Sequence, residues 1–427
     1  MHPSHIFPVN NFKVIKDKVL NWSQQFDTFS FLDNHQYQLH PHTQECLVGA
    51  GVKRYIQPAA DSLHQLQQFL NEKKGWYFGH LAYDLAEELY PGLQPQTPSS
   101  VPFARLFFYE PEIVIRLSGD RLEIIADNAE RIYEEITGTP VATNDNELPV
   151  TLQSRLTQSQ YIHTIEQLRR HILRGDCYEI NFCQEFFATG IPINPLQVYQ
   201  RLSAASPNPF SALYKQGQQW LLCASPERFL QKSGDTLLSQ PIKGTSKRIP
   251  GNEASDKASR QSLEQSTKDR SENVMIVDLV RNDLARVCEE ATVQVDELFG
   301  IYSFPQVHQM ISTISGKVAD DVDFAGIMKA LFPMGSMTGA PKKRVAELIA
   351  AYEPVKRGLF SGAVGYIDPA GDFDFNVVIR SILYNGLNNY VSVLAGSGIT
   401  FYSNPQSEWE ECKMKVDAME KVLAGQW

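Results

Sequence analysis

The stretch Pro241-Ile242-Lys243-Gly244-Thr245 places a lysine inside a turn flanked by apolar, strand-like residues. A free lysine titrates near ~10.4 and is almost entirely ammonium at neutral pH, so a nucleophilic Lys243 needs a lowered pKa. Burial and neighbouring cations both lower the pKa of a lysine, and Lys247 and Arg248 follow closely in the sequence. Without further context, a solvated lysine in a turn is the simpler interpretation.

Two acidic pairs lie further along the chain. Asp269 and Glu272 are three residues apart at the start of a helix expected over 268–288, and Glu408 and Glu411 are three apart in the last helix. Residues three apart share one helix face, so two facing pairs would offer oxygen ligands to Mg²⁺. Acids in a first turn also simply complement the helix dipole. From the residues alone, both interpretations remain open.

The last helix has a clear start and a clear apolar face. Asn404 is the expected N-cap and Pro405 stands in the first turn. Apolar residues then recur at spacings of three and four, which predicts one buried stripe: Trp409, Cys412, Val416, Met419 and Leu423. Glu411 and Lys415 also have the spacing of an ordinary surface ion pair.

Two glycine-containing segments are candidates for binding an anion. Gly396-Ser397-Gly398 follows an expected strand over 390–395, and glycines allow backbone N–H groups to converge on a carboxylate. The stretch 335–341, which includes Ser336, leads into a helix expected near Pro341, and a helix N-terminus attracts anions. A plain turn is the simpler interpretation of both segments when they are taken alone.

The distribution of turn formers and periodic segments predicts an α+β protein in two regions. Residues 137–153 are a connector between an N-terminal region, 1–150, and a C-terminal region, 151–427. Helices are expected over 61–73, 128–136 and 158–174. Strands are expected over 112–117, 121–125, 178–188, 219–224, 228–232, 236–242, 309–318, 361–367, 374–384 and 390–395. Sheets with interspersed helices favour α+β over a regular βαβ alternation.

Composition argues against a nucleic-acid-binding protein and against a membrane protein. The chain has 427 residues, 43% of them hydrophobic, and a net charge of −10, which disfavours a nucleic-acid surface. Its six cysteines have neither CxxC nor zinc-type spacing and are expected to be reduced thiols. The sequence shows no signal peptide and no apolar run of transmembrane length, so no membrane association and a cytoplasmic location are expected.

Several segments together resemble the chorismate-utilising enzyme family, and the resemblance covers most of 158–424. The segments that carry it are Gly175-Asp176-Cys177-Tyr178-Glu179-Ile180-Asn181, Ser225-Pro226-Glu227-Arg228-Phe229, Val277-Asp278-Leu279-Val280-Arg281-Asn282-Asp283-Leu284, Gly362-Ala363-Val364-Gly365-Tyr366 and Ile379-Arg380. The lysine within Pro241–Thr245 resembles that of the branch that forms 4-amino-4-deoxychorismate.

The resemblance implies a fold and a set of site residues. The fold would be a single αββα assembly of two large, packed antiparallel sheets. Glu272 and Glu411 would bind Mg²⁺, with Asp269 and Glu408 supporting through water. The resemblance assigns the remaining residues to catalysis, namely Lys243, Glu179 and Ser336, and to substrate contacts, namely Arg380, Tyr366, Gly396, Ser397, Gly398 and Thr245.

The branch assignment rests mainly on two positions. Anthranilate synthases usually have alanine where Lys243 stands, and isochorismate and salicylate synthases usually have a lysine base where Glu179 replaces the commoner glutamine. Gln309 stands where family members often carry a histidine tied to pyruvate elimination. The resemblance implies that Lys243 attacks chorismate and that ammonia displaces it. The ammonia would come from solution or from a separate glutamine amidotransferase subunit, since no Gly-x-Cys-x-Gly elbow occurs. An anthranilate synthase large subunit and a catalytically silent chorismate-binding subunit remain the alternatives.

Overall fold

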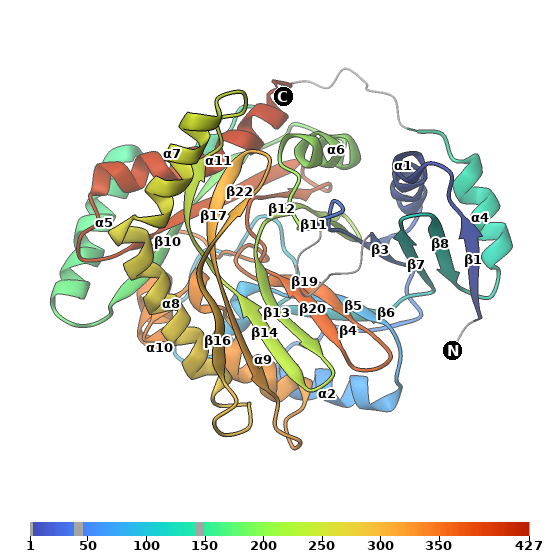
Figure 1. Cartoon of the computed structure of the whole chain (residues 1–427), viewed down its shortest axis with the longest axis horizontal. Helices are drawn as coiled ribbons and strands as arrows, with labels where there is room; N and C mark the ends of the chain where they lie inside the picture. The colour runs from blue at the N-terminus through green and yellow to red at the C-terminus, as the bar shows by residue number, and fades with distance from the viewer. Residues whose placement is uncertain (1–2, 38–45, 142–148, 427) are drawn as a thin grey trace.

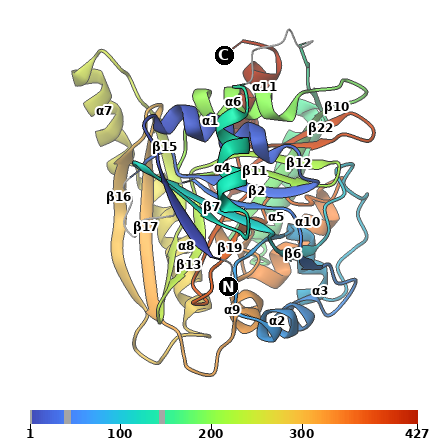
Figure 2. The ribbon, with the colours of Figure 1, turned by 90° about the vertical axis from the view of Figure 1, so that its right-hand side faces the viewer.

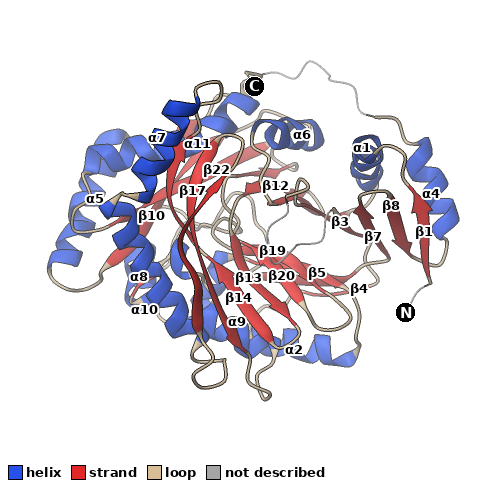
Figure 3. Cartoon of the chain, in the orientation of Figure 1, coloured by secondary structure: helices blue, strands red, loops and turns tan. Residues whose placement is uncertain are grey.

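The computed structural model describes residues 3–37, 46–141 and 149–426 (Figure 1). Residues 142–148 of the expected connector therefore lie outside the described residues. The described elements form two large antiparallel sheets with helices around them, and Figure 3 shows the strands in the interior and the helices toward the periphery.

Within the described residues, the first sheet has 12 strands. In order across the sheet they are β1 (Ser4–Pro8), β8 (Arg121–Ile125), β7 (Ile113–Ser118), β3 (Leu47–Ala50), β2 (Thr28–Asp33), β11 (Phe210–Gln216), β12 (Gln219–Ser225), β21 (Ser381–Asn385), β22 (Tyr390–Ile399), β10 (Glu179–Ala188) and β18 (Gly339–Ala340), with β9 (Gln153–Ser154) pairing with β10 outside this row. The expected strands at 112–117 and 121–125 are confirmed as the hairpin β7–β8.

The second sheet has 10 of the described strands. Their order is β15 (Ile242–Lys247), β17 (Val307–Lys317), β14 (Thr236–Gln240), β13 (Arg228–Ser233), β20 (Phe373–Asn376), β19 (Ala363–Ile367), β5 (Tyr77–Leu81), β6 (Leu106–Glu110) and β4 (Arg54–Ile56), with β16 (Gln294–Ser303) pairing with β17. The long strands β16 and β17 lie side by side in both views of the ribbon (Figures 1 and 2).

Helices cover the outer face of each sheet. Those packed on the first sheet are α1 (Phe12–Ser23), α4 (Ala129–Gly138), α5 (Gln158–Leu173), α6 (Pro195–Ala205), α10 (Lys342–Tyr352) and α11 (Pro405–Leu423). Those packed on the second are α2 (Ser62–Glu72), α8 (Thr267–Leu284) and α9 (Phe324–Leu331). The shorter α3 (Ala86–Leu89), the helix α7 (Glu253–Glu264) and the 3₁₀ turns η1 (Tyr83–Leu85) and η2 (Gly335–Met337) complete the described helices.

The alternation of side chains along each strand divides the core into two clusters. In β11, Leu213 joins the cluster beneath the helices, while its neighbours Ala212 and Tyr214 join the cluster between the sheets. Successive residues of a strand point to opposite faces, so one strand serves both cores. The layer order is helices, sheet, sheet, helices, and the expected α+β, αββα architecture is confirmed.

Strands from the two expected regions are neighbours in both sheets. In the first sheet β11 pairs with β2, with Leu213 opposite Phe31. In the second sheet β19 pairs with β5, with Gly365 opposite Gly79. The division near residue 150 therefore does not coincide with a boundary between sheets.

Three local expectations are wrong. The strand expected over 374–384 is two strands, β20 and β21, separated by residues 377–380, where Arg380 has a φ of +51°. The segment 396–398 does not follow a strand, because β22 continues through it to Ile399. Lys243 is not in a turn but in β15, which pairs with β17. Local propensity does not reveal these features because long-range strand pairing determines them.

The expected last helix is confirmed. It begins at Pro405, and the Asn404 side chain accepts a hydrogen bond from the Ser407 backbone N–H. Its expected apolar stripe is buried or partly buried against the first sheet. Within the described residues, no helix has both the length and the apolar character needed to cross a bilayer.

Candidate active site

Lys243 lies at an irregularity in β15. The register with β17 shifts between Ile242 and Thr245, and Gly244 adopts a φ of +92°, which favours glycine. A methyl group at Gly244 would lie 2.9 Å from the Asp269 Cβ in the first turn of α8. Glycine therefore lets the strand pack against α8 while the Lys243 side chain, only 11% exposed, is directed inward.

The Lys243 ammonium is bonded to a buried carboxylate. Its Nζ donates to Glu179 Oε1 at 2.6 Å, and the Glu179 side chain is 2% exposed. Glu179 is the first residue of β10, whose neighbour β22 brings Gly398 against the pair. A Cβ at Gly398 would lie 2.7 Å from Glu179 Oε1 and 3.1 Å from Lys243 Nζ. The absence of a side chain at this position leaves room for the pair.

The surroundings of Lys243 favour its charged form. Burial by itself would lower the pKa of the ammonium, but the Glu179 carboxylate, followed by the charges of Glu272 and Glu227, raises this pKa above its ordinary value. The geometry and the neighbouring charges thus favour the ammonium form of Lys243 within a buried pair. A nucleophilic role requires that this proton first leave.

The cations expected to lower the Lys243 pKa do not do so. Lys247 is exposed at the end of β15. The Arg248 guanidinium is engaged by the Asp256 carboxylate, with its Nε 2.9 Å from Oδ1. The anions that surround Lys243 come from segments distant in sequence, and adjacency along the chain does not reveal them.

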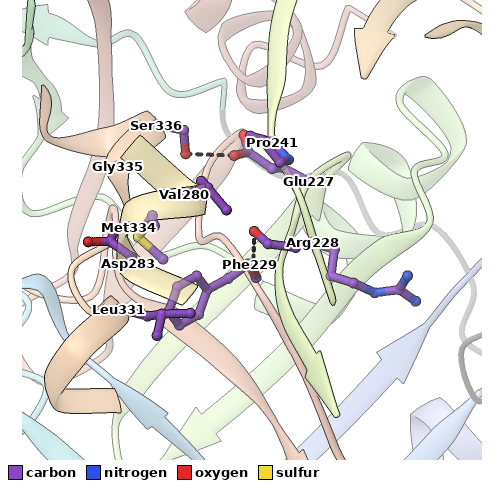
Figure 4. Close-up of a pocket in the computed structure, with 11 residues that line it drawn as sticks. Glu227, Arg228, Phe229, Pro241, Val280, Asp283, Leu331, Met334, Gly335 and Ser336 are labelled. Atoms are coloured by element: carbon purple, nitrogen blue, oxygen red, sulfur yellow. Dashed lines mark hydrogen bonds between the residues drawn. The ribbon is translucent and has the colours of Figure 1, made fainter. Parts of the chain in front are cut away.

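Glu227, in the connection between β12 and β13, is a second buried carboxyl group. It is 4% exposed and accepts a hydrogen bond of 2.6 Å from the Ser336 hydroxyl (Figure 4). Burial raises the pKa of Glu227 to about 7, and Ser336 and the Lys243 charge offset only part of the effect of burial. The Asn181 side chain donates to the Ser336 carbonyl at 3.0 Å, which fixes η2 beside β10. Glu227 can therefore hold a proton near neutral pH.

A small cavity adjoins this acid. Glu227, Ser336 and Pro241 line it together with apolar side chains of α8 and α9, and its volume is about 20 Å³ (Figure 4). That is enough for about one water molecule and too little for a substrate. Ser336 thus contacts Glu227 and lines this small cavity.

The two acidic pairs come together around one cation. α8 begins after Ser266, whose side chain accepts from the Asp269 N–H, so Asp269 stands in the first turn. The Lys268 ammonium lies 3.9 Å from Glu272 Oε1 on α8 and 3.7 Å from Glu408 Oε1 on α11. These two helix starts, 136 positions apart at Glu272 and Glu408, therefore face one another.

Two oxygens of this cluster are buried without a hydrogen-bond partner among the described residues, Glu272 Oε1 and Glu408 Oε2. Burial raises the pKa of Glu272 to about 7, and the charge on Lys243 offsets this only in part. Partnerless carboxylate oxygens suit a hard divalent cation. Across residues 3–37, 46–141 and 149–426, the side chains do not place three or more carboxylate, imidazole or thiol groups within reach of one metal ion. Carboxylate oxygens are the donor type that Mg²⁺ prefers, and in this arrangement the Lys268 ammonium lies between Glu272 and Glu408.

Glu411 forms the ion pair that its spacing predicts. Its Oε1 lies 2.8 Å from the Lys415 ammonium. Burial alone would raise the pKa of Glu411, but the nearby cations, Lys415 foremost, outweigh burial and leave this pKa below its ordinary value. Lys415 also donates to the Gly396 carbonyl at 2.8 Å. The second acidic pair is thereby tied directly to β22.

Arg380 and the segment 396–398 lie beside this helix. The Arg380 guanidinium donates to the Lys415 carbonyl at 3.2 Å, and burial lowers its pKa despite the charge on Glu411. Beyond Val393, β22 pairs with β10 on one side but no longer with β21. The edge of β22 at Gly396–Gly398 therefore has no β21 partner, and the Gly396 carbonyl accepts the hydrogen bond from Lys415. The Ser397 hydroxyl is buried and lies 3.4 Å from the Tyr161 hydroxyl.

Two of the expected substrate residues lie elsewhere. Tyr366, in β19, lines a different cavity with Asp33 and Asp374, and four strands separate β19 from β15 in the sheet. Thr245 is exposed in β15, opposite Gln309 of β17. Strand spacing of about 4.8 Å places Tyr366 too far from Lys243 for both to contact one small substrate.

Three residues of the cluster received no role from sequence reasoning. Glu227 lies in the family-like segment 225–229, but its burial and its contact with Ser336 depend on tertiary packing. Lys268 and Lys415 contact the acidic pairs of α8 and α11. The only sequence signal for both was the i,i+4 spacing to Glu272 and Glu411.

The scaffold and the buried charges together define an αββα enzyme with a lysine–carboxylate site. A family model described as chorismate binding enzyme matches residues 20–421. The chain belongs to the chorismate binding enzyme family.

Individual relatives agree with this assignment. The anthranilate synthase component I-like protein of Synechocystis sp. is 34% identical over 360 residues, covering 82% of this chain and 73% of the relative. Aminodeoxychorismate synthase component 1 of Escherichia coli is 37% identical over 271 residues, which cover 64% of this chain and 59% of the relative, less than two thirds of its length. The crystal structure of anthranilate synthase component I from Streptococcus pneumoniae has a TM-score of 0.75 at 23% identity, covers 98% of this chain and 92% of that chain, and shows the shared fold.

Proposed function

We propose that this chain converts chorismate and ammonia into 4-amino-4-deoxychorismate. The observation that carries the proposal is the buried Lys243, whose ammonium lies 2.6 Å from Glu179 and within the field of Glu272 and Glu227. Family membership supports chorismate as the substrate, and the name of the Escherichia coli relative supports amination. Buried lysines serve as nucleophiles in other enzymes once they have lost their proton.

In the proposed mechanism, neutral Lys243 attacks C2 of chorismate while the C4–O bond breaks. Protonated Glu227 gives its proton to the leaving hydroxyl, which departs as water. Ammonia then forms a bond to C4, the bond from C2 to Nζ breaks, and the electron pair returns to Lys243. The C4 ammonium gives one proton back to Glu227, which is then ready for another turnover. The pKa of about 7 suits Glu227 to both transfers.

The residues that would hold Mg²⁺ are Glu272 and Glu411, with Asp269 and Glu408 supporting through water. The fit rests on the partnerless buried oxygens of Glu272 and Glu408 and on the all-oxygen donor set. When bound, the ion would supply positive charge that orients a substrate carboxylate. Arg380 and the open edge of Gly396–Gly398 would bind substrate carboxylates beside it.

We expect Glu272→Gln and Glu411→Gln each to weaken Mg²⁺ binding at least about tenfold without unfolding the chain. An amide oxygen keeps the shape of the side chain but loses the charge that a hard cation requires. Calorimetric titration with Mg²⁺ measures the binding, and circular dichroism checks the fold. Asp278→Asn and Glu410→Gln, at exposed positions of α8 and α11, are the matched controls. Unchanged Mg²⁺ binding in both test variants would return these acids to the role of complementing helix dipoles.

The isolated chain is expected to use ammonium but not glutamine as its nitrogen source. Glutamine hydrolysis needs an activated nucleophile beside a base, whereas all six cysteines are buried and none lies in a Gly-x-Cys-x-Gly segment. A separate glutamine amidotransferase subunit would deliver the ammonia. The test is incubation with chorismate, Mg²⁺ and either nitrogen source, with products identified by mass. Glutamate release that scales with the purified chain and survives repurification would refute the expectation.

The same incubation separates the alternatives. An anthranilate synthase would release pyruvate and yield an aromatic product, and the name of the Synechocystis relative keeps this alternative in view. Against it, Lys243 occupies the position where that branch usually has alanine, and Gln309 replaces the histidine tied to pyruvate elimination. A catalytically silent binding subunit would show no turnover with either nitrogen source.

A further inference from the structure

The buried pair raises a chemical question about the nucleophile. Lys243 must lose a proton before its nitrogen can attack carbon, yet Glu179 holds it as an ammonium ion in the structure. The side chains of both residues are largely excluded from solvent, at 11% and 2% exposure. Once a substrate covers the site, the proton must therefore pass to a group of the protein.

The charged groups around Lys243 leave one suitable acceptor. Glu227, from the β12–β13 connection, must itself be protonated to serve as the acid. Glu272, from α8, has no ion pair with Lys243 within 4.0 Å among the described residues and lies instead toward Lys268. β22 contributes the uncharged Gly398. Glu179, from β10, is in direct contact.

Glu179 also has one acceptor oxygen without a described hydrogen-bond partner. Its Oε2 is buried and has no hydrogen-bond partner among the described residues, so the Lys243 ammonium on Oε1 is its one described donor. A carboxylate is held in its charged form by the hydrogen bonds it accepts. When further water is excluded, a buried ion pair with so little support can neutralise itself by moving one proton.

We propose that Glu179 is the base that takes the proton of Lys243 when chorismate enters the site, a step that rests on the amination proposed above. The Nζ–H bond breaks and an O–H bond forms on Glu179, so an ammonium and a carboxylate become an amine and a carboxylic acid with no change in net charge. After ammonia has displaced the lysine, the Nζ electron pair takes the same proton back from Glu179. The pair returns to its starting form, and no other reactant is required.

Gly398 allows Glu179 and Lys243 to approach each other closely enough for the proposed proton transfer. A side chain at this position would meet both Oε1 and Nζ, at 2.7 and 3.1 Å, so only glycine leaves the two atoms at 2.6 Å from each other. Glu179 and Gly398 come from the neighbouring strands β10 and β22 of the first sheet, and Lys243 comes from β15 of the second sheet. The pair is thus formed across the contact between the two sheets.

The test compares the full-length chain with its Glu179→Gln variant, which keeps a hydrogen-bond acceptor for Lys243 but cannot accept its proton. Both are mixed with chorismate and Mg²⁺ without ammonia, and the covalent adduct on Lys243 is followed by intact-protein mass from about pH 6 to about pH 9. Glu179→Asp restores the carboxylate, and Glu410→Gln controls for the loss of one negative charge.

We expect the variant Glu179→Gln to form the adduct at least about thirtyfold more slowly at neutral pH. Its deficit should shrink by about tenfold per pH unit, because solvent must then remove the proton before the substrate enters. Taking the ratio of the two rates removes the pH dependence of groups that Glu179 does not influence, and saturating Mg²⁺ limits the contribution of Glu272, whose pKa the Glu179 charge raises. Glu179→Asp should recover part of the rate at neutral pH.

Two results would overturn the role of Glu179: equal rates at neutral pH, or a deficit that is the same at every pH, which would indicate that Glu179 only positions Lys243. A different result addresses the function itself. If the unaltered chain yields no aminated product even with ammonium present, the proposed amination fails, and the proton transfer with it.

Discussion

Replacing Lys243 by alanine should lower the rate of 4-amino-4-deoxychorismate formation by at least about a thousandfold, the scale of losing a covalent nucleophile. The physical reason is that Lys243 supplies the only described side-chain nitrogen bonded to Glu179 within the cluster. Steady-state assays with ammonium, and separately with an amidotransferase partner, measure the rate. Full activity of Lys243→Ala in both assays would refute the covalent mechanism.

Two further variants separate the roles of Lys243. Lys243→Arg keeps a cation beside Glu179 but cannot act as a nucleophile at neutral pH, so it should be as inactive as the alanine variant. Lys247→Ala, at an exposed position of the same strand, should behave like the unaltered chain. Ammonia attacking C2 directly in Lys243→Ala would yield anthranilate-type products, which mass analysis distinguishes.

Glu227→Gln should lower the amination rate by about 10²- to 10⁴-fold, the range typical of losing a general acid. The unaltered chain should also lose rate as the pH rises, because the pKa of Glu227 is about 7 and only its protonated form can donate to the leaving hydroxyl. The variant should lack this decline. Rates measured from pH 6 to about 9 under saturating Mg²⁺ test both statements.

The rates are measured under saturating Mg²⁺ because the pKa of Glu272 is also raised to about 7, so its ionisation would overlap with that of Glu227. A bound cation favours its carboxylate form and moves that ionisation below the measured range. Ser336→Ala should lower the amination rate less than Glu227→Gln does, since it removes the hydrogen bond to Glu227 but leaves the acid in place. A Glu227→Gln enzyme with the rate and pH profile of the unaltered chain would exclude Glu227 as the proton donor.

The features predicted best are those that short-range patterns specify. The Asn404 cap, Pro405 and the apolar stripe determine where α11 begins and which face it buries. The helix start at Ser266 likewise places Asp269 and Glu272 on one end of α8. Each of these depends on contacts within one or two helical turns, and the amino-acid sequence expresses such contacts directly.

The features predicted worst depend on pairing between distant strands. The sequence indicates no partner for Lys243, because Glu179 lies 64 positions away and reaches it only across two sheets. The same reason explains why Glu227 received no role and why the sequence does not indicate that Tyr366 lines a different cavity from that of Glu227. A motif gives the identity of a residue, while its environment comes from elements that meet only in the folded chain.

The pairing of β2 with β11 and of β5 with β19 bears on how this chain can be divided. Domain boundaries normally fall where few contacts cross, yet here a cut near residue 150 would run along two hydrogen-bonded ladders. Each fragment would expose two unpaired strand edges, one from each sheet. Unpaired edges can form hydrogen bonds with other chains and so promote aggregation. The change in composition near residue 150 therefore does not mark a boundary between two structural domains. Swapping of the two regions between relatives would have to preserve both ladders at once.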